Sequence, residues 1–330
     1  MCSLTLRWIA DKLKSVVFSA YCYSSGMKIS LSEEKKDRED NYQSKRVWST
    51  PVADDERSIP CPPVSEQSLL TTFGRERSKS ITKFLFVTDL DNTFVGLREE
   101  DDKALEELSK YLQEHQKYGT KIVYATGRSP TLYQELKESK KLLKPDALVL
   151  AVGTEIYLDG SNKPDSEWAK KLSDGWNRDV VVEIARDFSK LEPQQESEQR
   201  PFKVSFFIEE EAAITVIPQL DSEFRRRGLT VKLIYSGGED LDIIPHDSDK
   251  GQAVQFLRQK WQFLPEQTVV CGDSGNDIAL FAAGTWGIIV GNARSELLQW
   301  HQENVFDYHY RAKRYCAGGI LEGLKHFGFL

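Results

Sequence analysis

Two aspartates separated by a single residue, Asp89 and Asp91, follow directly after a short apolar run in this 330-residue chain. One carboxylate of such a pair can attack as a nucleophile, while the other gives and takes a proton as general acid and base. A calcium-binding loop fits poorly, because Phe94 stands where the sharp turn of that loop requires glycine. Thr93 could hold the turn by bonding to its own backbone, and a plain acidic turn is the alternative for this segment alone.

A second pair of aspartates, Asp273 and Asp277, lies in the glycine-containing segment GDSGND (272–277). Glycines let the backbone approach a ligand closely, and two acids spaced by four residues can converge on one hard cation. Mg²⁺ prefers one or two carboxylates together with phosphate and water oxygens. This segment therefore predicts a Mg²⁺ site.

Two further segments stand at expected helix starts. Thr126 and Gly127 precede a helix with Ser129 as its N-cap and Pro130 as its first residue, and a hydroxyl in such a place suits a phosphate oxygen. Lys250 stands at the entrance of another expected helix. Taken alone, the first segment is a capped helix start and the second a surface charge.

Short apolar runs predict the strands that position these groups. Residues 82–88, 121–125 and 268–271 are runs of the kind that is buried on both faces of a parallel sheet, and 147–152 predict another core strand. Residues 103–118 predict an amphipathic helix. The polar segments that follow the strands sit where an open α/β sheet binds its ligands.

In this order, the four segments resemble the motifs of the haloacid dehalogenase (HAD) superfamily of phosphatases. The resemblance implies an α/β fold with a Rossmann-like core and a parallel sheet. It implies Asp89 as the nucleophile that becomes an aspartyl phosphate, and Asp91 as the acid that protonates the leaving oxygen and then activates water. It also implies Thr126 and Gly127 as phosphate ligands, and Lys250 as the charge that neutralises the phosphoryl group and the nucleophile.

The same resemblance implies Mg²⁺ as the cofactor. Asp273 and Asp277 would hold or orient the ion, and Asp89 and the carbonyl of Asp91 would complete its site. Asn276 would reach the phosphate or the waters of the metal.

About 120 residues separate the second motif from the lysine, and within this superfamily such a spacing implies an inserted C2-type α/β cap. We expect the cap to close over the site and select the substrate. Its expected helices are 180–188 and 212–227, and its expected strands are 203–208, 231–235 and 241–244. The expected domains are an N-terminal extension at 1–80, the core at 81–157 and 247–330, and the cap at 158–246.

From residue 82 to 330 the chain resembles the sucrose-6-phosphate phosphatase family of plants and cyanobacteria. The resemblance rests on GTEIY (153–157), QRPFKVSFF (199–207), YSGGEDLDIIP (235–245) and CAGGILEGLKHF (316–327). The short cyanobacterial type fits best, because no extra C-terminal domain follows. The resemblance implies hydrolysis of sucrose 6-phosphate to sucrose and phosphate, the last step of sucrose synthesis.

Glu155, Lys203, Asp240 and the turn 236–238 are our candidates for contacting a sugar, and each also fits a surface salt bridge or a hairpin turn. Three other functions stay open. The chain could hydrolyse another glycoside phosphate, such as glucosylglycerol phosphate or mannosylfructose phosphate, since a few hydroxyl contacts decide between sugars. It could be an idle HAD domain that partners a sugar-phosphate synthase, although the motif acids and the lysine are all present, or it could be a mutase.

The composition narrows the class of protein. Lys and Arg number 44 against 51 Asp and Glu, which argues against a protein that binds nucleic acid mainly by neutralising phosphates. No apolar run approaches the length of a transmembrane helix, and five scattered cysteines indicate reduced thiols in an intracellular compartment. We expect a monomer that acts on a small sugar phosphate and can associate with a sucrose-phosphate synthase.

The first 80 residues are expected to lie outside the fold. Residues 1–26 are basic, acid-poor and amphipathic, a pattern that resembles an organellar transit peptide and favours the chloroplast over the cytoplasm. A surface helix or an unstructured tail is the alternative. Residues 28–79 are polar and rich in helix breakers, so we expect them to stay mobile.

Overall fold

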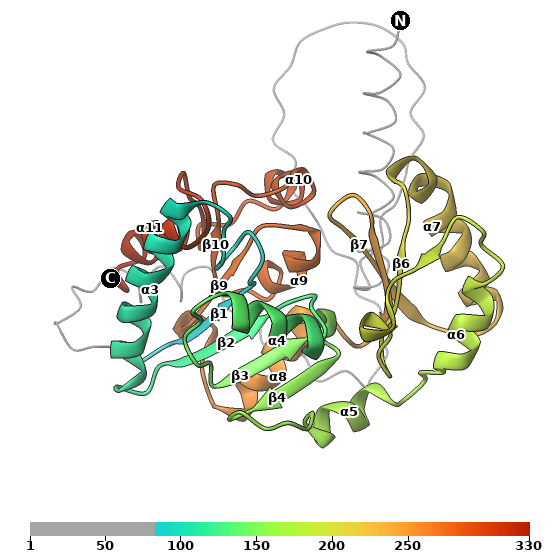
Figure 1. Ribbon diagram of the computed structural model, residues 1–330, viewed down its shortest axis with the longest axis horizontal. Helices are drawn as coiled ribbons and strands as arrows, with labels where there is room; N and C mark the ends of the chain where they lie inside the picture. Colours follow the sequence, from blue (N-terminus) through green and yellow to red (C-terminus); the bar gives the residue numbers. More distant parts are fainter. Residues whose placement is uncertain (1–82) are drawn as a thin grey trace, which may run out of the picture. The chain divides into compact units, whose positions relative to one another are not determined.

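The computed structural model describes residues 83–330, which lie within one compact unit (Figure 1). The extension predicted for 1–80, with its expected transit peptide, lies outside the described residues. Within 83–330, no helix is both long enough and apolar enough to cross a membrane.

The four predicted core strands, β1, β2, β3 and β9, lie together in one seven-stranded sheet, in the order β11-β10-β9-β1-β2-β3-β4. Strands β4, β10 and β11 were not predicted. Neighbouring strands are parallel except for β3 and β4, which run antiparallel. The prediction of an α/β fold with a parallel core sheet is confirmed. The strands are β1 (Leu85–Thr88), β2 (Lys121–Ala125), β3 (Ala147–Leu150), β4 (Glu155–Leu158), β9 (Thr268–Gly272), β10 (Trp286–Ile289) and β11 (His309–Arg311).

Strand β1 occupies the centre of this sheet, with β2 on one side and β9 on the other. The chain builds outward from β1 through β2 and β3, and it later adds β9, β10 and β11 on the opposite side. Where the strand order reverses in this way, the loops diverge and leave a crevice at the carboxyl ends of the strands. The two aspartate pairs follow β1 and β9, so the sheet brings them to this crevice.

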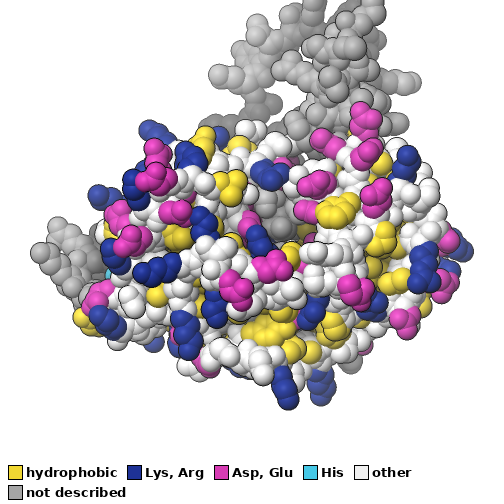
Figure 2. All heavy atoms as spheres, in the orientation of Figure 1, with side chains coloured by type: hydrophobic (Ala, Val, Ile, Leu, Met, Phe, Trp, Pro, Cys, Tyr) yellow, Lys and Arg dark blue, Asp and Glu magenta, His cyan; other side chains and the backbone are white. Residues whose placement is uncertain are grey.

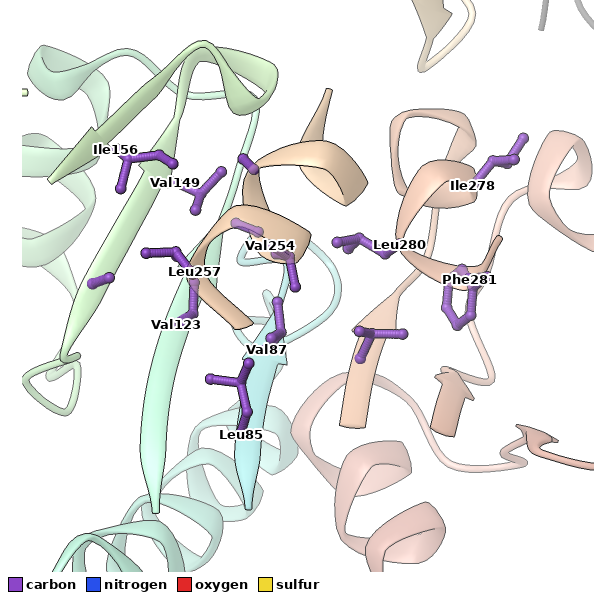
Figure 3. Close-up of a cluster of buried hydrophobic side chains, with 14 of the residues drawn as sticks. Leu85, Val87, Val123, Val149, Ile156, Val254, Leu257, Ile278, Leu280 and Phe281 are labelled. Carbon is purple, nitrogen blue, oxygen red and sulfur yellow. The ribbon is translucent and has the colours of Figure 1, made fainter. Parts of the chain in front are cut away.

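Successive residues of β1 face opposite sides of the sheet, and helices cover both sides. Figure 3 shows Leu85 and Val87 in one apolar cluster with Leu257 of α8 (Lys250–Lys260) and Leu280 of α9 (Ile278–Phe281). On the other side, α3 (Glu99–Gln116) packs against α11 (Cys316–His326). The helix α3 begins earlier than predicted, because four acids in its first turn suit a helix N-terminus. Further helices are α4 (Pro130–Ser139), α5 (Ser166–Leu172) and α10 (Ser295–Glu303).

Between β4 and α8 the chain builds a second, antiparallel sheet in the order β5-β6-β8-β7. Two helices pack on one of its faces around a separate apolar cluster that includes Val181, Leu220 and Ile243. The division of the chain into core and cap at 158 and 247 stays a prediction. The elements are α6 (Arg178–Ala185), β5 (Glu192–Pro193), β6 (Val204–Phe207), α7 (Glu210–Arg226), β7 (Val231–Ser236) and β8 (Asp240–Pro245).

Charged side chains of both signs are interspersed over the face drawn in Figure 2. This mixture agrees with the near balance of 44 basic and 51 acidic residues in the chain. In this view, the described residues form no extended cationic face of the kind that binds a phosphate backbone.

Candidate active site

Lys250 joins segments that lie far apart in the sequence. It is the first residue of α8 and is completely buried. Its ammonium nitrogen lies 2.7 Å from a carboxylate oxygen of Asp89, 2.7 Å from one of Asp277, and 2.7 Å from the side-chain oxygen of Asn276. The structure therefore brings the predicted lysine, nucleophile and acidic loop to one point.

The charges at this point shift one another's pKa. Burial raises the pKa of Asp89 well above its ordinary value; Lys250 opposes this shift, and the carboxylates of Asp277 and Asp273 add to it. Burial disfavours the charge of Lys250, yet Asp277 and Asp89 together raise its pKa, so this lysine stays cationic. One buried lysine does not compensate all of the negative charge around it.

Three buried acids could hold a metal ion. Asp89, Asp273 and Asp277 each offer one carboxylate oxygen, and these oxygens lie within 4.8 Å of one another. Burial, then Asp277, raises the pKa of Asp273 to about 7. Asp273 also accepts a hydrogen bond of 2.9 Å from the hydroxyl of Thr93, which therefore reaches across the site instead of holding its own turn. Crowded, buried, oxygen-only donors suit a hard divalent cation.

The second oxygen of Asp277 fixes the loop that carries Asp273. It accepts hydrogen bonds from the main-chain N–H groups of Asp273 (2.9 Å) and Ser274 (3.1 Å). The loop thus folds back on its own carboxylate, which explains why an acid four residues further along is needed here.

The carboxylate of Asp91 lies outside this acidic cluster and contacts Arg128 instead. The guanidinium donates to both carboxylate oxygens, at 2.7 Å from Nε and 2.8 Å from Nη2, and to the carbonyl of Leu132 at 3.0 Å. Such a two-pronged pair sets the orientation of the carboxylate. The main-chain N–H of Arg128 also donates to the hydroxyl oxygen of Thr126, at 3.2 Å, and the hydroxyl proton stays available for a ligand.

A cavity of about 540 Å³ opens above these groups. Its floor belongs to the loops after β1, β2 and β9, and its other wall belongs to the smaller sheet and the segment before β6. Residues that line it include, from the loops, Asp89, Asp91, Thr126, Gly127, Asp273 and Asn276, and, from the facing wall, Gln194, Glu198, Lys203, Asp240 and Asp242.

The facing wall is polar because side chains alternate along its strands. In β6 and β8, Val204, Phe206 and Ile243 face the apolar cluster, while Ser205 and Asp242 point to the opposite side. The hydroxyl of Ser205 donates to Asp242 at 2.6 Å. One face of the sheet thus builds a core and the other presents charged and polar groups to the cavity.

Lys203 is the buried centre of this polar wall, with 1% of its surface exposed. Its ammonium nitrogen lies 3.0 Å from Glu198 and 3.3 Å from Asp242. Burial disfavours its charge, but Asp242 and Glu198 together raise its pKa. The second carboxylate oxygen of Glu198 is buried and has no hydrogen-bond partner among the described residues, although Glu198 itself belongs to the lining of the cavity.

A profile of the family described as Sucrose-6F-phosphate phosphohydrolase matches residues 82–328. The chain belongs to this family. It is 43% identical over 258 residues to probable sucrose-phosphatase 2 from Arabidopsis thaliana, and the match covers 76% of this chain. The chain spans only 61% of the length of that relative.

Solved structures of two other proteins are similar to this family member. The sucrose-phosphatase from Synechocystis sp. PCC6803, crystallised with sucrose and phosphate, matches with a TM-score of 0.70 and 43% identity, over 75% of this chain and 99% of that one. A haloacid dehalogenase-like hydrolase from Bacillus subtilis matches with a TM-score of 0.55 and 18% identity, over 75% and 92% of the two chains. The predicted HAD fold is confirmed.

Glu155 lies elsewhere than expected for a sugar contact. This carboxylate is buried at the start of β4, where Arg200 donates to it at 2.6 and 3.1 Å and the hydroxyl of Tyr157 also donates to it. It is not among the residues that line the cavity. Lys203 and Asp240, named together with it, do line the cavity.

Sequence reasoning missed several residues that line the cavity. Asp242 could have been found, because a residue two positions after Asp240 on a strand faces the same side. Arg128 follows Thr126 and Gly127 directly, but its partner Asp91 belongs to another strand end. Glu198 and Gln194 come from an irregular segment, and no periodic pattern marks them. The missed residues include Arg128, Gln194, Glu198, Asp242 and Arg294.

Proposed function

We propose that this chain is a Mg²⁺-dependent phosphatase that hydrolyses sucrose 6-phosphate to sucrose and phosphate. The observation that carries the proposal is one cavity with two kinds of wall. Asp89 and Asp273 line its floor above the buried Lys250, and Lys203 with its acidic partners forms a wall that suits hydroxyl groups. Membership of the chain in its family supports the same reaction.

In the first half of the reaction, Asp89 acts as the nucleophile. One of its oxygens is held by Lys250 at 2.7 Å, and the other attacks phosphorus. The bond from phosphorus to the sugar oxygen breaks as the aspartyl phosphate forms. Asp91 gives its proton to the departing sugar oxygen, so that neutral sucrose leaves.

In the second half, water cleaves the aspartyl phosphate. Asp91, now ionised, accepts a proton from the water while the water oxygen attacks phosphorus. Asp89 is released as a carboxylate and inorganic phosphate leaves. Arg128 would orient the ionised Asp91 in this half through its two hydrogen bonds, and Thr126 would donate its hydroxyl proton to a phosphoryl oxygen.

Asp89, Asp273 and Asp277 would hold Mg²⁺ together with the main-chain carbonyl of Asp91. When bound, Mg²⁺ supplies positive charge that stabilises the transferring phosphoryl group. The crowding of the three carboxylates within 4.8 Å supports this assignment, because it leaves negative charge that Lys250 alone does not compensate.

We assign residues 158–246 to a cap that binds the sugar. Lys203 and Asp240 would take sugar hydroxyls, and the unpartnered oxygen of Glu198 would accept a further one. The cap would also keep bulk water away from the reacting phosphoryl group. Discrimination between sugars would rest on these buried polar groups, since a missing hydroxyl partner leaves them unpaired.

We further propose that the chain acts as a monomer in the plastid or the cytosol, beside a sucrose-phosphate synthase that supplies its substrate. The plastid assignment rests on the basic, acid-poor residues 1–26. A fluorescent fusion with and without this segment tests it, since loss of the segment should leave the fusion in the cytosol.

Phosphate release from a panel of sugar phosphates tests the proposed reaction. The panel contains sucrose 6-phosphate, mannosylfructose phosphate, glucosylglycerol phosphate and fructose 6-phosphate, and the full chain is assayed with Mg²⁺. Sucrose 6-phosphate should give the highest kcat/KM, and Asp89→Asn should release phosphate from none of them. A higher kcat/KM for another sugar phosphate would make that compound the preferred substrate. An active Asp89→Asn variant would refute the assignment of Asp89 as the nucleophile.

A further inference from the structure

Strand β7 of the smaller sheet lies against the loops of the larger sheet that carry the acids and Lys250. At its start, Lys232 contacts Asp249, whose carboxylate lies 2.5 Å from the ammonium nitrogen. Near its end, the carbonyl of Tyr235 would lie 3.2 Å from a Cβ atom at Gly275, in the loop of the acidic cluster. One strand thus follows the catalytic side of the core along its length.

The contact between Lys232 and Asp249 is buried, with 9% and 6% of the two residues exposed. Each oxygen of the carboxylate has a separate partner. One accepts the main-chain N–H of Gln252 at 2.7 Å and caps α8, and the other contacts Lys232. Because Asp249 directly precedes Lys250, the lysine of the smaller sheet acts on the first turn of the helix that carries the catalytic lysine.

A turn of the larger sheet holds the same helix start from another direction. Gly153 has φ +94°, and a Cβ atom there would lie 2.2 Å from the carbonyl carbon of Asp249. Only glycine allows this approach. Val152 beside it has φ +59°, a conformation that a β-branched residue rarely adopts. The backbone at 249–250 is thus packed against a fixed turn of the core, and Lys232 reaches it from the smaller sheet.

Lys250 needs this precision, because its ammonium makes three hydrogen bonds of 2.7 Å at once. All three acceptors are side chains of other loops. A small displacement of the helix start would lengthen some of these contacts, and misplacement of a catalytic group by about 1 Å can cost roughly 100-fold in rate.

We propose that Lys232 is a positioning residue for the phosphoryl-transfer step. Through its contact with Asp249 it fixes the start of α8, and so it sets where the ammonium of Lys250 lies. The smaller sheet would then help to assemble the catalytic floor in addition to binding the sugar. This inference rests on the proposed function, because it assigns Lys232 a part in that reaction.

Two substrates separate positioning from cap docking. p-Nitrophenyl phosphate presents the phosphoryl group without a sugar, whereas sucrose 6-phosphate needs both walls of the cavity. We would measure kcat and KM for both, with Mg²⁺, in the full chain and in Lys232→Met, Lys232→Arg and Lys190→Met. Lys190 is an exposed lysine between α6 and β5 for which the described residues provide no ion pair, so it serves as the matched control.

Lys232→Met should lower kcat by roughly 10-fold to 100-fold for both substrates, Lys232→Arg should restore most of the loss, and Lys190→Met should match the parent. If Lys232→Met leaves kcat for p-nitrophenyl phosphate unchanged and raises only the KM for sucrose 6-phosphate, the inference is overturned. The contact between Lys232 and Asp249 would then only dock the smaller sheet on the larger one. A parent chain that hydrolyses neither substrate would overturn the proposed function, and the inference with it.

Asp249→Asn provides the second variant if Lys232→Met fails to fold, as judged by its thermal melting curve. The amide can keep the oxygen that caps α8, while the oxygen that faces Lys232 is replaced by an uncharged NH2 group that cannot accept from the ammonium. The same loss of kcat for both substrates is expected, and a folded Asp249→Asn variant with the kcat of the parent would refute the positioning role.

Discussion

Within residues 83–330, two lysines are almost completely buried: Lys250 beneath the floor of the cavity and Lys203 in its polar wall, with 0% and 1% of their surfaces exposed. Each ammonium lies between two carboxylates. In both places burial disfavours the charge, and the carboxylates outweigh this effect and raise the pKa. The two regions thus use the same local arrangement.

The regions differ in what their arrangement leaves unsatisfied. At the floor, a third carboxylate, Asp273, crowds the first two, so the excess is negative charge that suits a divalent cation. In the wall, the excess is one buried oxygen of Glu198 without a partner, which suits a neutral hydroxyl donor. A buried lysine between two acids therefore does not by itself define a function. The function depends on the charge or the hydrogen-bonding group that the arrangement leaves without a partner.

The largest difference between the two lysines should appear in Lys250→Met. We expect kcat to fall on the order of 1,000-fold for sucrose 6-phosphate and for p-nitrophenyl phosphate alike, because the lost charge faces the phosphoryl group that both share. Steady-state kinetics with both substrates would measure it. If Lys250→Met loses activity only with sucrose 6-phosphate, Lys250 acts in substrate selection, and the proposed difference between Lys250 and Lys203 is wrong.

Mg²⁺ dependence should be a property of the floor of the cavity, so it should change in variants of the floor and not in variants of the wall. Chelation with EDTA should abolish turnover of both substrates, and added Mg²⁺ should restore it. Asp273→Asn should raise the Mg²⁺ concentration for half-maximal rate by at least about tenfold, since Mg²⁺ loses one of its carboxylate ligands. Glu198→Gln is the matched control, and an equal rise in that variant would contradict the assignment.

Lys203→Met should give the opposite pattern from Lys250→Met. We expect kcat/KM for sucrose 6-phosphate to fall roughly 100-fold, because buried partners of the sugar hydroxyls are left unpaired, while p-nitrophenyl phosphate keeps its rate within about threefold. Removal of one partner of a buried ion pair costs about 3–5 kcal/mol, so thermal melting must accompany the kinetics. Glu198→Gln keeps the shape of the wall and should show the same selectivity with a smaller loss of stability.

The contrast between the regions also explains how much the sequence could predict. The residues of the floor could be predicted from the sequence because Asp89, Asp273 and Thr126 each follow a buried strand, and parallel strands bring their carboxyl ends to one edge. The elements that apolar runs and periodicity predicted are present in the predicted order, and the helix α3 differs mainly in where it begins. Other elements of the described residues were not predicted: β4, β5, β10, β11, α5, α9, α10 and α11.

The contacts within the wall were harder to predict from the sequence, because some of the residues that Lys203 contacts come from an irregular segment. The contact between Lys203 and Glu198 depends on how the segment before β6 folds back, and neither periodicity nor spacing encodes it. Glu155 shows the same difficulty, since its partner Arg200 lies 45 positions further along. Sequence indicated which acids were available, and only the fold decides which cation each one meets.

The smallest effect belongs to Asp240, which tests whether the wall contributes an ionised acceptor. Burial, then Asp242 and Glu239, raises its pKa from an ordinary value of 3.8 to about 6. The parent should bind sucrose 6-phosphate a few-fold better than Asp240→Asn at pH 7, and this advantage should vanish at pH 5, where the carboxyl is protonated. The ratio of kcat/KM between parent and variant cancels the ionisation of the substrate, and a ratio that is constant with pH would contradict the role.

The same shift makes a prediction for stability with a definite sign. Because the pKa is raised in the folded state, protonation of Asp240 favours folding below pH 4, and this contribution is lost as the pH rises through about 6. The full shift corresponds to about 3 kcal/mol, and solvent screening at this partly exposed side chain reduces it to about 1 kcal/mol. Urea unfolding of Asp240→Asn should therefore show a free energy of unfolding about 1 kcal/mol above that of the parent at pH 8 and equal to it near pH 4. Asp187→Asn, at an exposed position, should show no such dependence, and a difference for Asp240→Asn that grows as the pH falls would reverse the sign and reject the argument.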